Sequence, residues 1–69
     1  MKAPQLRAAR EAKVLSQDEL AQKAGVSRIT VSHLESGRDA YPSTIRKLAT
    51  ALGVEPGTLT STAPSGASA

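Results

Sequence analysis

The chain has 69 residues with one Tyr as its only aromatic residue and no Cys, so it can form one small domain without a deep cleft. Without Cys, neither a disulfide nor a thiolate metal site can stabilise the fold. Nine Lys and Arg against six Asp and Glu give a net charge of +3, which favours a polyanionic partner. The short apolar runs and the polar N-terminus predict no membrane span and no secretion signal, and hence a cytoplasmic protein.

Apolar residues recur at helical spacing and no alternating strand pattern persists, which predicts an all-α fold, a compact bundle of five short helices. The first helix is expected over about residues 4–13, with Pro4 in its first turn. The second begins at SQDE, where Ser16 and Glu19 can form a capping box. Gly25 supplies its left-handed stop.

Polar residues also mark the boundaries of the next two helices. Ser27 is expected to cap a third helix, which runs to Ser36 and stops at Gly37. Ser43 is expected to cap a fourth helix, and Gly53 to end it. The fourth helix has the clearest apolar spacing in the chain, which predicts that one of its faces is buried.

The last part of the chain changes in composition. A short fifth helix is expected to start at Pro56. From Thr60 onward the sequence TSTAPSGASA contains no large apolar residue and is typical of a disordered tail or linker. The predicted domain is therefore 1–59, followed by a tail over 60–69.

The stretch SQDELAQKAGVSRITVSHLESG predicts two helices that cross steeply at a glycine turn, with the small Ala21 at the contact. The residues that would fix the crossing are Leu20, Val26, Val31 and Leu34. Together with IRKLATALGV, this stretch resembles the phage-repressor and Cro type (XRE-like) of helix-turn-helix DNA-binding domain, over about residues 5–59. The resemblance implies a lambda-repressor-like bundle whose third helix, about 27–36, enters the major groove while the second lies across the DNA backbone.

In such proteins the first residues of the third helix contact base edges. Here they are Ser27, Arg28, Ile29, Thr30, Ser32 and His33. Ile29 faces away from the apolar stripe, and it could bury itself against the thymine methyl, while Arg28 matches the two acceptors of guanine. The alternatives are an exposed Ile29 without a partner and a solvated His33.

A second set of residues is assigned to the phosphates: Gln17, Arg38, Ser43, Thr44 and Arg46. Gln17, Ser43 and Thr44 stand at helix starts, where free backbone amides suit phosphate oxygens, although capping alone would also explain them. The loop RDAYP has Asp39 and Ala40 where related repressors often have basic residues, so minor-groove contact is not expected. The other cations are read as solvated surface: Lys2, Arg7, Lys13, Lys23 and Lys47.

Arg10 and Glu35 are assigned to the structure rather than to DNA. Each lies near the packing side of its predicted helix, so each needs a partner if it is partly buried. In the phage repressors that this chain resembles, the same two positions hold an Arg and a Glu that pair. The resemblance therefore implies an ion pair between them.

A homodimer on a pseudo-palindromic site is expected, because one recognition helix reads too few base pairs to select a single site in a genome. The predicted dimer contact is Val54, Pro56 and Leu59. Their apolar groups are expected to have little cover within one chain, and this segment forms the dimer contact in the repressors that the sequence resembles.

The sequence thus predicts a sequence-specific binder of double-stranded DNA that regulates transcription, most simply a repressor. It is expected to be a bacterial or phage protein that associates with the nucleoid. The alternative is an antitoxin or coactivator-like protein-interaction module on the same fold. The sequence shows no nucleophile with a base, no metal-ligand cluster and no phosphate-binding glycine loop. An enzyme, a cofactor and a small-molecule substrate are therefore not expected.

Overall fold

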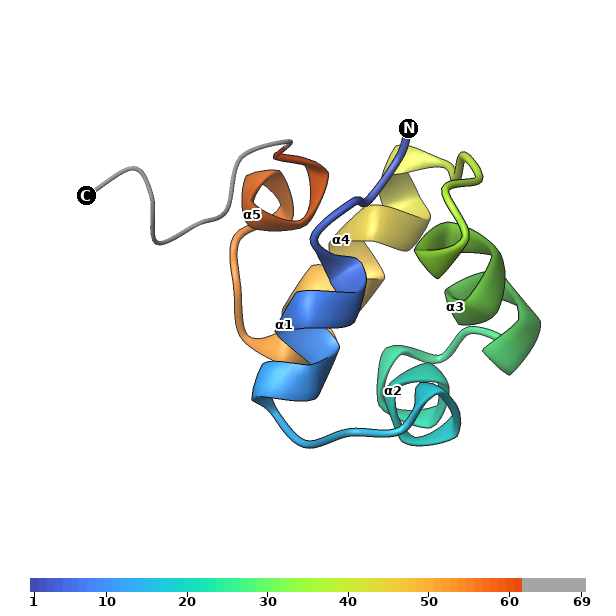
Figure 1. The fold of residues 1–69 in the computed structure, drawn as a ribbon, viewed down its shortest axis with the longest axis vertical. Helices are drawn as coiled ribbons and strands as arrows, with labels where there is room; N and C mark the ends of the chain where they lie inside the picture. Colours follow the sequence, from blue (N-terminus) through green and yellow to red (C-terminus); the bar gives the residue numbers. More distant parts are fainter. Residues whose placement is uncertain (62–69) are drawn as a thin grey trace.

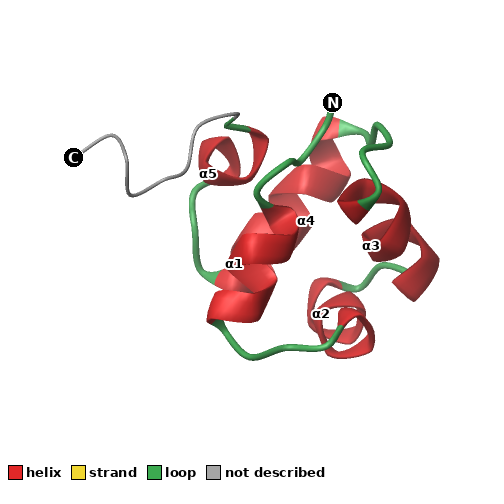
Figure 2. Ribbon diagram, in the orientation of Figure 1, coloured by secondary structure: helices red, strands yellow, loops and turns green. Residues whose placement is uncertain are grey.

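Five helices and no strands form residues 1–61, the part of the chain that the computed structural model describes. They are α1 (Leu6–Ala12), α2 (Gln17–Ala24), α3 (Arg28–Glu35), α4 (Pro42–Leu52) and α5 (Pro56–Thr60). In Figures 1 and 2, α2 and α3 lie together at one side of the molecule and α5 lies at the other. The predicted all-α bundle is confirmed, although α5 includes Thr60 and the rest of the predicted tail, from residue 62, lies outside the described residues.

The starts of α2 and α3 have the predicted side-chain caps. Ser16 Oγ accepts a hydrogen bond from the Glu19 amide at 3.0 Å, and the Glu19 carboxylate accepts one from the Ser16 amide at 2.9 Å. Ser27 Oγ accepts from the Thr30 amide at 3.1 Å. These bonds satisfy amides that the helices themselves leave unpaired, so the predicted capping box and the predicted cap of α3 are both confirmed.

The start of α4 differs from the prediction, which was wrong for Ser43. The helix begins one residue earlier, at Pro42, and its N-cap is Tyr41, which makes no cap bond through its side chain. Proline suits this first position because its ring fixes a helical φ and its missing N–H would have no partner there. Ser43 is consequently an exposed residue of the first turn rather than the cap.

Two helices end at glycines, whereas α1 does not. Gly25 and Gly53 follow α2 and α4 with φ of 74° and 70°, the left-handed conformation that was expected of them. After α1, the same conformation falls on Val14, with φ of 55°. Because a β-branched residue is strained there, this position is an unexpected feature of the fold.

Side chains from all five helices meet in one core. The large residues that are fully or almost fully buried are Leu6, Leu20, Val31, Leu34, Ile45, Leu48, Leu52 and Leu59. Helix α2 packs against both α3 and α4, and α4 packs against α5. The core therefore fixes α3 against the scaffold from one side and leaves its other side open.

The burial of α5 corrects one premise of the predicted dimer contact. Leu59 exposes none of its surface, because α5 folds back over the core and the Leu59 carbonyl accepts a hydrogen bond from the Gln5 amide at 3.1 Å. Val54 is half-buried against the same core, and Pro56 is also half-buried. The chain itself covers Leu59 completely, so the expectation that it lacks cover was wrong, whereas Val54 and Pro56 keep part of their surface exposed.

Candidate nucleic-acid interface

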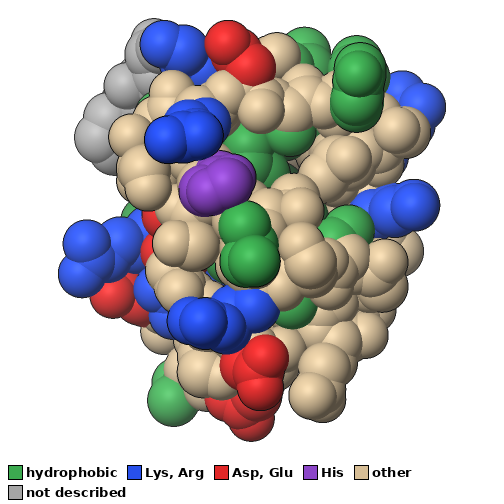
Figure 3. Space-filling model, turned by 90° about the vertical axis from the view of Figure 1, so that its right-hand side faces the viewer, with side chains coloured by type: hydrophobic (Ala, Val, Ile, Leu, Met, Phe, Trp, Pro, Cys, Tyr) green, Lys and Arg blue, Asp and Glu red, His purple; other side chains and the backbone are tan. Residues whose placement is uncertain are grey.

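Helix α3 uses only Val31 and Leu34 to contact the core. Arg28, Ile29 and His33 lie on its outer side, and Ile29 exposes 60% of its surface although it is apolar. Arg28 and His33 are also exposed. Figure 3 shows this face, with the His side chain near its centre, Lys and Arg side chains around it and the acidic side chains toward the margins.

The six predicted base contacts are not equally free. The Ser27 and Thr30 hydroxyls lie 2.9 Å apart and hydrogen bond to each other. Ser27 also caps the helix, so its oxygen is engaged within the protein. Ser32 is half-buried. Arg28, Ile29 and His33 are therefore the most accessible of the set.

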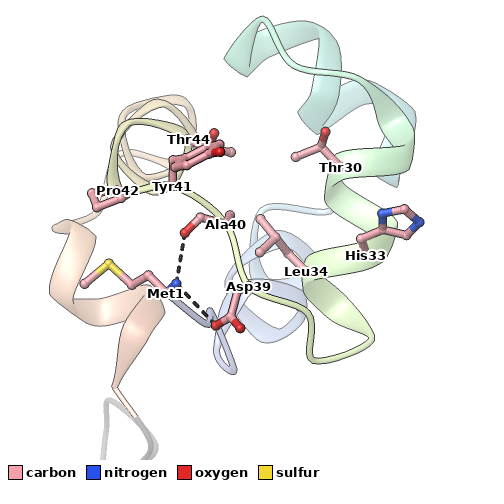
Figure 4. A pocket seen from close by; sticks show the side chains of 9 residues that line it. All are labelled: Met1, Thr30, His33, Leu34, Asp39, Ala40, Tyr41, Pro42 and Thr44. Carbon is pink, nitrogen blue, oxygen red and sulfur yellow. Dashed lines mark hydrogen bonds and ion pairs between the residues drawn. The ribbon is translucent and has the colours of Figure 1, made fainter.

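A groove separates α3 from the loop before α4 and the first turn of α4 (Figure 4). Thr30 and Leu34 point into it from α3, and Thr44 lies on the opposite side, whereas the His33 ring points away. Tyr41 lines the same groove and exposes 80% of its surface. Tyr41 and Thr44 thus bring hydroxyl groups to the lining of this groove, whereas the Thr30 hydroxyl is bonded to Ser27.

The N-terminus holds the loop between α3 and α4. The Met1 ammonium donates to the Ala40 carbonyl at 3.0 Å and lies 3.2 Å from an Asp39 carboxylate oxygen (Figure 4). The Ala40 amide in turn donates to the Met1 carbonyl at 2.7 Å. Asp39, at a position where related repressors often have a basic residue, therefore holds the loop to Met1.

Of the predicted phosphate contacts, Ser43 and Arg46 are exposed and Thr44 is half-buried, all in the first turns of α4. Arg38 is exposed just after α3. Thr44 lines the groove opposite Thr30 of α3, whereas Ser43 and Arg46 line a separate groove between α2 and α4. Gln17 differs, because its side-chain amide donates a hydrogen bond to Glu35 of α3.

Gln17 joins the pair of Arg10 and Glu35. Arg10 Nε lies 2.6 Å from one Glu35 carboxylate oxygen, and Arg10 Nη2 lies 3.1 Å from the other. Gln17 Nε2 donates to the same carboxylate at 3.0 Å, and Arg10 Nη1 donates to the Leu15 carbonyl at 2.7 Å. The structure shows the ion pair that the resemblance implied, and it adds Gln17 as a third member that the sequence did not indicate.

Burial and hydrogen bonding act in opposite directions on Glu35. Burial favours its neutral form, but the hydrogen bonds from Arg10 and Gln17 and the positive charge of Arg10 outweigh that effect and lower the pKa of Glu35. The hydrogen bond to Glu35 is the main reason why the pKa of Arg10 is raised. Both groups are thus charged at neutral pH. Their ion pair joins α1 to α3, and the bond from Gln17 adds α2.

Two further features are absent from residues 1–61. No group of three metal-ligating side chains lies together there. None of the helices in that range has the length and hydropathy needed to cross a membrane.

Comparison with known proteins agrees with this geometry. Residues 6–59 match the helix-turn-helix family HTH_3, so the chain belongs to that family and is a DNA-binding regulator of the XRE type. Among solved structures, it is similar to the restriction-modification controller protein C.AhdI from Aeromonas hydrophila, with 46% identity, a TM-score of 0.77, and coverage of 81% of this chain and 86% of that one. No curated protein matches. The resemblance inferred from the sequence is confirmed.

Proposed function

We propose that this regulator binds a specific duplex sequence with α3 in the major groove and represses transcription by blocking a promoter, in the cytoplasm at the nucleoid. The observation that carries the proposal is the exposed side of α3, where Arg28, Ile29 and His33 take no part in the core. An exposed apolar side chain between two polar ones has an evident partner in a base edge that carries a methyl group.

Selection from a random pool of duplexes, followed by gel shift, tests the proposal. On the selected site, Arg28→Ala should cost about 1–3 kcal/mol and relax the preference for one guanine. Arg7→Ala is the matched control, because Arg7 is an exposed cation on α1, where it pairs with Glu11. Failure to select any sequence would overturn the proposal, whereas an equal loss on all sequences would make Arg28 a phosphate contact.

We also propose that two copies bind a pseudo-palindrome, since a single α3 contacts only a few base pairs. The half-burial of Val54 and Pro56 leaves part of each available to a second copy, while Leu59 serves the core. The half-site centres would lie about one helical turn, ~34 Å, apart. Inserting about five base pairs at the centre turns one half-site to the far face, so affinity should fall to that of a single site. Unchanged affinity, or one protein per duplex, would refute the dimer.

The similarity to C.AhdI supports a narrower proposal for the genes concerned. That protein is a restriction-modification controller, and the two chains share 46% identity over most of their lengths. We therefore expect the selected sequence to occur upstream of endonuclease or methyltransferase genes in the source genome. A reporter placed behind such a promoter should respond to the wild-type protein and not to Arg28→Ala.

A further inference from the structure

A groove lined by basic residues runs between α2 and α4, beside the face described above. Its polar lining consists of Lys23, Ser43, Arg46, Lys47 and Thr50. A second groove continues it toward the end of α1 and shares Lys23 and Thr50 with it, adding Lys13. We call Lys13, Lys23, Arg46 and Lys47 the basic flank. No Asp or Glu among the described residues lines either groove.

The basic flank is not neutralised by the protein. The ion pairs found within residues 1–61 join Met1 to Asp39, Arg7 to Glu11, and Arg10 to Glu35, and none of them includes a residue of the basic flank. Glu19, one turn before Lys23 on α2, attracts it, but the Glu19 carboxylate is bonded to the Ser16 amide. The basic flank thus combines Lys13, just after α1, with cations of α2 and α4, and a polyanion would complement this charge.

The groove shares two residues with the surface that is proposed to contact DNA. Ser43 and Arg46 line it, and both are also among the residues expected to contact phosphates next to α3. A strand of DNA that follows this groove would pass its three cations, Lys23, Arg46 and Lys47. A linear ligand with regularly spaced charges fits cations that extend from the end of α1 over α2 and α4 better than a compact anion does.

We propose that the basic flank binds the phosphodiester backbone of duplex DNA just outside the base pairs that α3 reads. The inference rests on the proposed function, because α3 must first place the duplex. It assigns a binding role to Lys23 and Lys47, which belong to α2 and α4 and lie outside the recognition helix. Affinity should consequently depend on the length of DNA beyond the recognised bases, and that dependence should disappear when these lysines are neutralised.

The test compares two duplexes that carry the same selected sequence. One ends at the last selected base pair on each side, and the other continues for about ten further base pairs of random sequence on each side. Wild-type protein should bind the longer duplex more tightly, with a steeper salt dependence. Between about 50 and 200 mM salt, wild-type affinity for the longer duplex should fall roughly tenfold more than the affinity of Lys23→Gln/Lys47→Gln, because the variant lacks two phosphate contacts. On the shorter duplex, the two proteins should lose affinity equally.

Two controls separate charge from position. Lys2→Gln/Arg7→Gln removes the same net charge from residues outside the basic flank, and it should keep the length effect. Lys23→Arg/Lys47→Arg keeps the charge in the groove, so this variant should also bind the longer duplex more tightly. All four positions are exposed, so circular dichroism should show unchanged folding.

The outcomes distinguish this inference from the proposed function. If wild-type protein selects no sequence and binds neither duplex, the proposed function is overturned and this inference with it. If it binds both with equal affinity, or if Lys23→Gln/Lys47→Gln weakens both equally, specific DNA binding stands and the role of flanking DNA is refuted. In that case, an acidic protein surface becomes the ligand to test next on the basic flank.

Discussion

Helices α3 and α4 differ in how they use their side chains. Four of the eleven residues of α4 are buried, at the spacing expected of a helix that packs along its whole length. Only two of the eight residues of α3 are buried. Helix α4 thus contributes mainly to the core, while α3 contributes only the two buried side chains that hold it in place. Substitutions of the buried residues of α4 should change stability, and those on the outer side of α3 should change DNA affinity alone.

The largest effect is expected at Leu48 of α4, which is fully buried. Leu48→Ala removes buried methyl groups and leaves a cavity, so it should cost about 2–5 kcal/mol in the free energy of unfolding. For a domain of this size, such a loss leaves a large unfolded fraction at 37 °C. Chemical denaturation followed by circular dichroism measures it, with the exposed Thr50→Ala on the same helix as the control. A loss equal to that of the control would contradict the division of roles.

A smaller effect is expected where α1 and α3 meet. Glu35→Gln leaves the Arg10 charge without its carboxylate, and the two side chains expose only 7% and 12% of their surfaces. We expect a loss of about 1–3 kcal/mol, because this burial lies between that of an exposed pair and that of a fully buried one. Arg7→Gln, which breaks the exposed pair with Glu11, should cost much less.

The same pair predicts a dependence on pH. Because the folded-state pKa of Glu35 lies below its ordinary value of 4.5, its contribution to stability is complete above pH 4.5. It is lost as the pH falls through the lowered folded-state pKa. Thermal unfolding between pH 7 and about pH 3 should therefore show a steeper acid loss for wild type than for Glu35→Gln. Parallel curves would show that the carboxylate is not stabilised in the fold.

Ile29 should show the reverse behaviour to Leu48. Ile29→Ala should leave the unfolding temperature unchanged, because the side chain is 60% exposed. Replacing the contacted thymine by uracil removes one methyl group and should weaken wild-type binding by about 0.8 kcal/mol. The Ile29→Ala protein should not respond to that replacement. If uracil at every position leaves wild-type affinity unchanged, Ile29 does not contact a thymine methyl.

Local features of this fold were predictable from the sequence. The capping box of Ser16 and Glu19 and the stop at Gly25 depend on residues a few positions apart, so the sequence contains all that is needed to recognise them. The outward position of Ile29 also followed from helical periodicity. The ion pair of Arg10 and Glu35, in contrast, was expected because of the family resemblance.

Contacts between distant segments were harder to predict. The bond between Gln17 and Glu35 joins residues 18 positions apart, and no local pattern indicates it. The burial of Leu59 depends on how α5 folds back on the core, which a five-residue helix does not reveal by periodicity. The basic flank collects residues from three helices for the same reason. Tertiary packing determines these three features. The sequence names the cations, but it does not show which of them lie together.

Val14 gives a small expected effect that is opposite in sign to the others. It follows α1 in the left-handed conformation, where its branched side chain is strained, and it exposes 87% of its surface, so it contributes little packing in return. Val14→Gly removes the strain but gives the unfolded chain more freedom, so the net gain in stability should be at most about 1 kcal/mol. Val14→Ala, which keeps a Cβ without the branch, should gain less. Thermal unfolding of the three proteins measures the series, and a destabilised glycine variant would show that the Val14 side chain holds the end of α1.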